Sequence, residues 1–320
     1  MNKRSFLTLI GVVFTATLQS AHAQPFPSKP LRIIEPAGVG SAVDVFARKL
    51  SGPLAERLGQ PVVVDNRPGG NSAIGAREAA RAPADGYTLF HANINNSLND
   101  LLLNDACCKL NEALIPITML TSSPLVMVVP ASLGVKTLAE YQAWARTNPD
   151  RATFASGGSG SVTQLIGTKV NMLTGLKVLE VPYKAIGAEM PDLLAGHVAT
   201  AFLAPVVVAQ HIKAGRLIAL GVAGERRVPI ISEVATLSEQ GLRGAIAMGW
   251  NGLFVPAGTP RPVIQKLQAD IAAIMATPDF QKDARDLGYE LGGGSTDDFA
   301  AYIRSELNRW GEVIRDARIK

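Results

Sequence analysis

The sequence has few of the residues that most often carry catalysis or bind metal ions. Its 320 residues include four histidines and two cysteines, and the histidines beyond residue 23 show no ligand spacing with a cysteine, a carboxylate or each other. Cys107 and Cys108 are adjacent, so a disulfide between them would close a strained ring. We expect free or partly buried thiols, with a strained bridge or an intermolecular bond as alternatives. No metal site, cofactor or catalytic residue is predicted.

The sequence also lacks an apolar run of the roughly 20 residues that span a bilayer. Its longest candidate, Phe6–Leu18, follows Lys3 and Arg4 and precedes a small-x-small site at 21–23. This pattern is typical of a secretory signal peptide, so residues 1–23 are expected to be cut off after Ala23, leaving a soluble exported protein. Loss of Lys3 and Arg4 takes the formal net charge from +4 to +2. No basic run follows, and nucleic-acid binding is not predicted.

What the sequence does contain is an alternation of short apolar strands and helical patterns. This alternation predicts an α/β fold with mainly parallel sheets flanked by helices. A mature chain of this length is long for one core, so we expect two lobes. The segment Leu114–Pro130 is expected to make the first crossing between the lobes, and Met248–Val255 the return, with Trp250 as a hinge or core residue.

The stretch 31–50 predicts a strand, a small-residue loop and a helix start. The strand Leu31–Ile34 is stopped by Pro36 and the glycines after it, and the segment Ser41–Asp44 has the pattern of a capping box. Such a turn directs free amides and the positive end of a helix dipole toward a ligand, which favours an anion, although every βα connection needs a turn and a cap. The loop lacks the glycine pattern of a nucleotide site.

A second such loop is predicted in the other half of the chain. The strand 152–155 runs into six small residues, Ser156–Ser161, just before a helix that starts at Val162. Three hydroxyls and several exposed amides offer more donors than a connection requires. The stretch is not a G-x-S-x-G nucleophile motif, because position 161 is serine. A third polar loop, Asn93–Ser97, follows the strand 87–92.

Together these pieces describe two lobes that each present a small-residue loop to a shared cleft. Several segments in this order resemble the Bug family, the extracytoplasmic substrate-binding proteins of tripartite tricarboxylate transporters. The segments are PSKPLRII (27–34), GQPVVVDNRPGGNSAIGA (59–76), ADGYTL (84–89), FASGGSGS (154–161), VPYK (181–184), IKAGRLIALGV (212–222) and PAGTP (256–260).

The resemblance implies a two-lobed periplasmic-binding-protein fold of the type II kind. Lobe 1 would comprise 24–124 and 250–320, and lobe 2 would comprise 125–249. A small organic carboxylate would be held between the lobes and delivered to the membrane permease subunits of the transporter, and we expect a periplasmic monomer. The positions that match the family's ligand loops are Ala37, Gly38, Val39, Gly40, Ser41, Ala42 and Val43, and Ser156, Gly157, Gly158, Ser159, Ser161 and Thr163. Asn93, Tyr183 and Leu203 at strand ends are added as candidates, with packing as the alternative for Tyr183.

Two departures from the family pattern bear on the ligand. Ser41, Ala42 and Val43 replace glycines and a threonine, and the strand that ends at Leu203 lacks the aspartate that many members carry. Apolar groups therefore stand where polar ones are usual, which favours a monocarboxylate or aromatic carboxylate over citrate-like acids. Two other functions remain open: a binding protein that signals to a sensor kinase, and an exported hydrolase.

Overall fold

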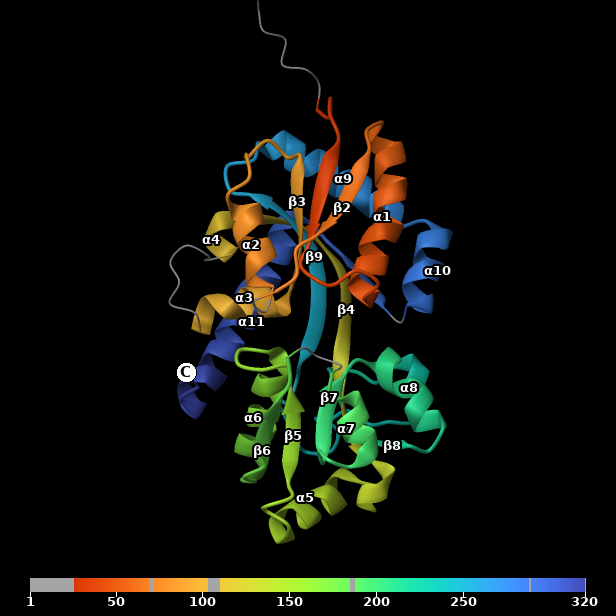
Figure 1. Cartoon of the computed structure of the whole chain (residues 1–320), viewed down its shortest axis with the longest axis vertical. Helices are drawn as coiled ribbons and strands as arrows, with labels where there is room; N and C mark the ends of the chain where they lie inside the picture. Colours follow the sequence, from red (N-terminus) through yellow and green to blue (C-terminus); the bar gives the residue numbers. More distant parts are fainter. Residues whose placement is uncertain (1–25, 70–71, 103–109, 185–187, 288, 320) are drawn as a thin grey trace, which may run out of the picture.

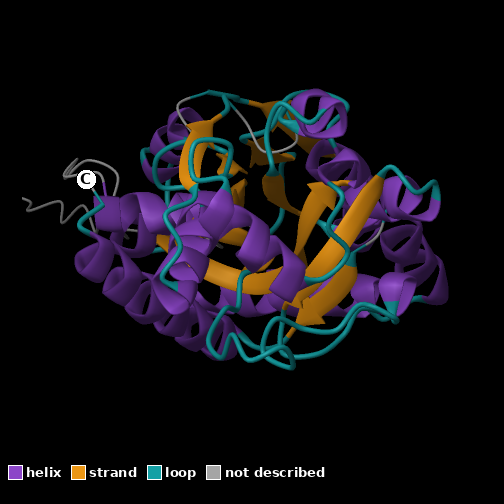
Figure 2. Ribbon diagram, turned by 90° about the horizontal axis from the view of Figure 1, so that it is seen from below, coloured by secondary structure: helices purple, strands orange, loops and turns teal. Residues whose placement is uncertain are grey.

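The computed structural model describes residues 26–69, 72–102, 110–184, 188–287 and 289–319. The predicted signal peptide, 1–23, and both cysteines, Cys107 and Cys108, lie outside the described residues. Figure 1 shows two lobes, one above the other, joined by long strands at the waist. Figure 2 shows that the strands occupy the interior and that helices cover them on the outside. The predicted two-lobed α/β fold is confirmed.

Lobe 1 is built on the sheet β2-β1-β3-β9-β4-β10. Its elements are β1 (Leu31–Glu35), α1 (Ala42–Leu58), β2 (Val62–Asn66), α2 (Ala73–Ala80), β3 (Thr88–Asn93), α3 (Ile94–Leu102), α4 (Leu110–Ala113), α9 (Arg261–Met275), α10 (Pro278–Asp286), β10 (Glu290–Gly293) and α11 (Thr296–Ala317).

Lobe 2 is built on the sheet β6-β5-β7-β4-β8. Its elements are the 3-10 helix η2 (Ala131–Leu133), α5 (Leu138–Thr147), β5 (Thr153–Ser156), α6 (Val162–Thr174), β6 (Leu179–Pro182), α7 (Met190–Ala195), β7 (Thr200–Leu203), α8 (Pro205–Lys213), β8 (Leu217–Ala223) and the 3-10 helix η3 (Pro229–Ile231).

Two long strands pass between the lobes, β4 (Leu114–Pro130) and β9 (Met248–Pro256). The first part of β4 pairs with β9 and β10, and from Leu125 onward it pairs with β7 and β8. One strand thus belongs to both sheets. The division of the chain into 24–124 with 250–320 and 125–249 stays a proposal that rests on this change of partners.

The expectation that each sheet is mainly parallel is wrong. β1 pairs in parallel with β2 and β3, and β5 pairs in parallel with β6 and β7, as predicted. The crossing strands β4 and β9 run antiparallel to their neighbours, and so does β10. Each sheet is therefore mixed, because a strand that passes directly from one lobe to the other enters without the crossover helix that a parallel neighbour needs.

One cluster of buried side chains continues from lobe 1 into lobe 2. Leu98 of α3, Leu165 of α6, Trp250 of β9 and Phe299 of α11 all belong to it. Trp250 is 1% exposed and packs edge-on against Phe299, with 5.2 Å between ring centroids. Of the two roles predicted for Trp250, the core role is the one observed. No helix among the described residues is long and apolar enough to cross a lipid bilayer.

Candidate functional site

Sheet register brings the two loop-bearing edges toward the same place. In lobe 1 the strand β3 ends at Asn93, which pairs with Asn251 of β9. Asn251 in turn pairs with Thr121 of β4. In lobe 2 β7 ends at Leu203, which pairs with Val126 of β4. Both edges therefore face the short stretch of β4 between Thr121 and Val126. We call this region the interlobe junction, and the loops β1–α1 and β5–α6 both face it in Figure 1.

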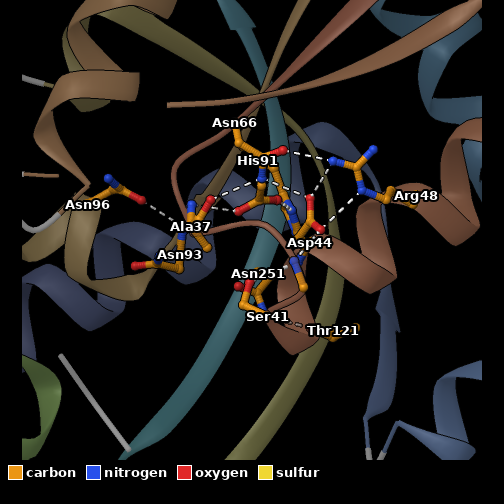
Figure 3. A network of polar contacts seen from close by, with 12 residues as sticks. Ala37, Ser41, Asp44, Arg48, Asn66, His91, Asn93, Asn96, Thr121 and Asn251 are labelled. Atoms are coloured by element: carbon orange, nitrogen blue, oxygen red, sulfur yellow. Dashed lines mark hydrogen bonds and ion pairs between the residues drawn. The ribbon is translucent and has the colours of Figure 1, made fainter. Parts of the chain in front are cut away.

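The β1–α1 loop is tied down by acidic side chains, as Figure 3 shows. Ala37 N donates to Glu35 Oε1 at 3.0 Å, and Gly40 N donates to Asp44 Oδ2 at 2.8 Å. Ser41 caps α1 as predicted, since its Oγ accepts from Asp44 N. The Asp44 carboxylate reaches Gly40 N, one residue before the amide expected for a capping box. Amides predicted to hold an anion are thus partly engaged by the protein itself.

Asp44 is the centre of this network. Burial disfavours its charge, but hydrogen bonds from Arg48, Gly40 N and Asn66 outweigh this effect and hold the pKa of Asp44 below its usual value. Asn66 Nδ2 donates to Asp44 Oδ1 at 2.8 Å and to Ala37 O at 3.0 Å. The carboxylate therefore fixes the loop from beneath while remaining ionised.

A buried pair supports the start of the same loop. Glu35 and His91 are 1% and 2% exposed, and Glu35 Oε2 lies 2.5 Å from His91 Nδ1. The other oxygen of Glu35 is the acceptor for Ala37 N. No hydrogen-bond partner for His91 Nε2 is found among the described residues. Sequence reasoning missed this pair, because Glu35 and His91 are 56 residues apart and follow no motif.

What remains exposed on the β1–α1 loop is its tip. Gly38, Val39 and Gly40 are exposed, and Val39 is 77% exposed. Within the described residues, the amides of Gly38 and Val39 donate no hydrogen bond. A Cβ added to Gly38 or Gly40 would meet no atom within 4 Å. Ala42 and Val43 form the first turn of α1. The tip is open to an incoming group.

Two hydroxyls of the β5–α6 loop, and that of Thr163 at the start of α6, are turned inward rather than toward solvent. Ser156, Ser161 and Thr163 are fully buried. Ser156 Oγ donates to Glu180 Oε1, and Thr163 Oγ1 accepts from Gly157 N at 2.8 Å. Ser156 and Ser161 were among the hydroxyls predicted to be adaptable donors, and Thr163 was matched to the family's ligand loop. Their hydrogen bonds here hold the loop, and their part in ligand binding stays a prediction.

Two further positions of this loop are Gly158 and Ser159. Gly158 has φ +90°, a left-handed conformation that favours glycine. Ser159 is exposed, and its amide donates no hydrogen bond within the described part of the chain. The amide of Thr163, in the first turn of α6, also donates no hydrogen bond within the described part of the chain, because helix-terminal amides lack intrahelical acceptors.

The three added candidates differ in position. Asn93 lies at the junction, and its Oδ1 accepts from Asn95 N at 2.9 Å, which helps to start α3 where a loop was expected. Tyr183 is half-buried, and its hydroxyl donates to Asp192 Oδ2 at 2.7 Å; burial first and then Asp192 raise the pKa of Tyr183 to about 12. Leu203 is 1% exposed and packs in the core of lobe 2.

A contact between the lobes adds a residue that was named in the sequence only as part of a polar loop. Val162 N, at the start of α6, donates to Asn95 Oδ1 of α3 at 3.1 Å.

A cavity of about 670 Å³ also lies between the lobes. Its walls are Pro205 and Val206 of α8 and Val228–Ile230 on one side, and Met275, Tyr289 and their neighbours on the other. None of the predicted site residues lines it, but Pro205 directly follows β7, and the Tyr289 ring packs on Phe46 of α1.

The described residues hold no group of three or more histidine, cysteine, aspartate or glutamate side chains that could bind a metal ion. The junction presents amides, hydroxyls and carboxamides, which suit hydrogen bonding to a polar ligand. The placement of the ligand-binding residues stays a prediction.

Comparison with known proteins identifies the family. The model of the family described as "Tripartite tricarboxylate transporter family receptor" matches residues 46–319. A protein from the tcbD-tcbE intergenic region of Pseudomonas sp. (strain P51) is 33% identical over 315 residues, covering 97% of this chain and 94% of the relative.

Two solved structures share the fold. The periplasmic binding protein BugD has a TM-score of 0.80 and 27% identity, and an R. palustris protein solved with adipate has a TM-score of 0.82 and 28% identity. Each comparison covers 92% of this chain and 99% of the other. The predicted resemblance is confirmed: this chain belongs to the tripartite tricarboxylate transporter receptor family, to which the Bug proteins belong.

Proposed function

We propose that the protein is a periplasmic receptor that captures a small organic carboxylate at the interlobe junction and delivers it, unchanged, to the permease of a tripartite tricarboxylate transporter. The observation that carries the proposal is the meeting of two βα loops at one junction, each leading into a helix N-terminus. The helices α1 and α6 are 17 and 13 residues long. Their positive dipole ends and unpaired amides attract an anion.

Binding by neutral donors suits a receptor that must release its ligand. The amides of Gly38, Val39, Ser159 and Thr163 have no acceptor among the described residues. A carboxylate held by such groups is stabilised without a buried ion pair, whose disruption on release would be costly. The structure solved with adipate supports the ligand class, since its chain has the same fold.

We propose further that the ligand is a monocarboxylate or an aromatic carboxylate. The support is the apolar character of the end of β7 and of part of the interlobe cavity. Leu203 ends the strand where many family members carry an aspartate, and α8 begins two residues later at Pro205. The interlobe cavity beside them is lined by Val206, Val228 and Met275. These apolar residues favour an apolar body, while the polar side chains of Ser123, Gln281 and Arg285 also line the cavity.

Isothermal titration against benzoate, adipate, malate and citrate tests the ligand class. We expect benzoate to bind more tightly than citrate, and tight citrate binding without benzoate binding would reverse this preference. If none of the acids binds, the receptor assignment to organic carboxylates is wrong.

A matched pair of variants tests the place of binding. Gly158→Leu should weaken binding, because Gly158 lies in the β5–α6 loop at the junction. Gly134→Leu is the control: Gly134 has a similar left-handed φ of +77°, also in lobe 2, and a Cβ there would meet no atom within 4 Å. The two variants carry a similar backbone strain. Equal affinities for the two would place the ligand elsewhere.

A further inference from the structure

Asn95 is a lobe 1 side chain whose acceptor atom is held by lobe 2. Its Oδ1 accepts from Val162 N at 3.1 Å, and Val162 is the first residue of α6. An amide at the start of a helix has no acceptor within that helix. Asn95 supplies this acceptor from the other lobe.

This contact determines which atom of the Asn95 carboxamide is free to contact a ligand. A backbone amide can only donate, so the atom that faces Val162 must be the oxygen of Asn95, and the free branch must be the Nδ2 group. Asn95 Nδ2 has no acceptor within the described ranges of the chain, and the side chain is partly exposed at the junction. A flip of the carboxamide would place two donors against each other and break the cap.

The backbone that carries Asn95 is held as well. Asn95 N donates to Asn93 Oδ1 and Asn93 N donates to Asn96 Oδ1, both at 2.9 Å. The β5–α6 loop also lies directly against α3. A Cβ on Gly160, which has φ +78°, would come within 2.8 Å of Leu102 Cδ1. The position of Asn95 is therefore set from both lobes.

We propose that Asn95 determines specificity at the junction by donating a hydrogen bond from Nδ2 to the ligand's carboxylate. The inference rests on the proposed function and deepens it. Val162 locks the carboxamide as a donor, so Asn95 selects a group that accepts hydrogen bonds and disfavours one that only donates, such as an ammonium group. Asn95 thus joins the two lobes and selects a hydrogen-bond acceptor on the ligand with the same carboxamide.

Replacement of Asn95 by aspartate separates these two roles. Asn95→Asp keeps an oxygen for Val162 N and replaces the free donor by a negatively charged acceptor. Asn95→Ala removes both. Asn308→Asp is the control for the added charge, since Asn308 is exposed on α11. Affinities for benzoate and adipate are measured by isothermal titration, and melting temperatures by calorimetry without ligand.

We expect Asn95→Asp to melt close to Asn308→Asp and to bind about 10- to 100-fold more weakly, as for the loss of a hydrogen bond to a charged group. Asn95→Ala should lower both the affinity and the melting temperature. If Asn95→Asp binds within about twofold of Asn308→Asp, the inference is overturned while the proposed function stands. If the unaltered protein binds neither acid, the inference fails together with the carboxylate assignment that it deepens.

Discussion

Replacing Asp44 should remove the hydrogen bonds that hold the β1–α1 loop and so destabilise the folded protein. The carboxylate is 1% exposed and accepts at 2.8 Å from both Gly40 N and Asn66 Nδ2. Asp44→Ala leaves these two donors without their acceptor, and each hydrogen bond to a charged group contributes about 1.5–3 kcal/mol. Arg48 is half exposed and can be hydrated again, so its ion pair adds less than about 1 kcal/mol. We expect the free energy of unfolding to fall by about 3–7 kcal/mol.

Urea unfolding followed by circular dichroism measures this loss. Asp283→Ala is the matched control, because Asp283 also pairs with a cation of α1, Lys49, at 2.8 Å but is 39% exposed. A pair of that exposure contributes about 0–1 kcal/mol. If the two variants unfold within about 1 kcal/mol of each other, the hydrogen bonds of Asp44 do not hold the loop as described.

The pH dependence of the same residue has a definite sign. The pKa of Asp44 is lowered in the folded state, so its ionised form stabilises the protein above the unfolded pKa of about 3.9. This contribution is lost as the pH falls through the lower pKa of the folded state. The stability advantage of the unaltered protein over Asp44→Asn should therefore shrink in that acid range and hold steady above it. A difference that stays constant down to about pH 2 would refute this.

Three further substitutions probe the core and a buried charge. Gly167→Ala would place a Cβ 2.4 Å from Phe154 Cε2, and we expect overpacking to cost about 1–3 kcal/mol; an unchanged melting temperature would contradict that close approach. Trp250→Ala should cost about 3–5 kcal/mol in denaturant unfolding, and a loss under 1 kcal/mol would mean that the interlobe core tolerates the cavity. Burial raises the pKa of Glu306, although Arg309 opposes it. The ionised form is therefore penalised, and Glu306→Gln should gain stability relative to the unaltered protein as the pH rises from about 4 to about 8; a constant difference would argue against it.

The sequence predicted the features that depend on local pattern. The cap of α1 at Ser41 forms as expected, because it requires only neighbouring residues. The strand and helix alternation likewise follows from hydrophobic period alone. These signals were sufficient to predict the two-lobed α/β class.

The features that were missed depend on residues far apart in the chain. The antiparallel course of β4 and β9 results from passage between lobes, which no local pattern records. The hydrogen bond from the Ser156 hydroxyl to Glu180, which comes from the next strand of the sheet, was not predicted. The bond between Asn95 and Val162 spans 67 residues. Side-chain direction in loops is decided by such distant partners, which is why the candidate site was less predictable than the fold.

The strand β4, which both sheets share, has a consequence for how the protein unfolds. Since β4 provides hydrogen-bond partners to both sheets, neither half can lose its strands without exposing main-chain groups of the other. Heating should accordingly melt the whole chain in a single calorimetric transition, and a fragment ending near residue 124 should fail to fold by itself. The two lobes should therefore form a single cooperative folding unit.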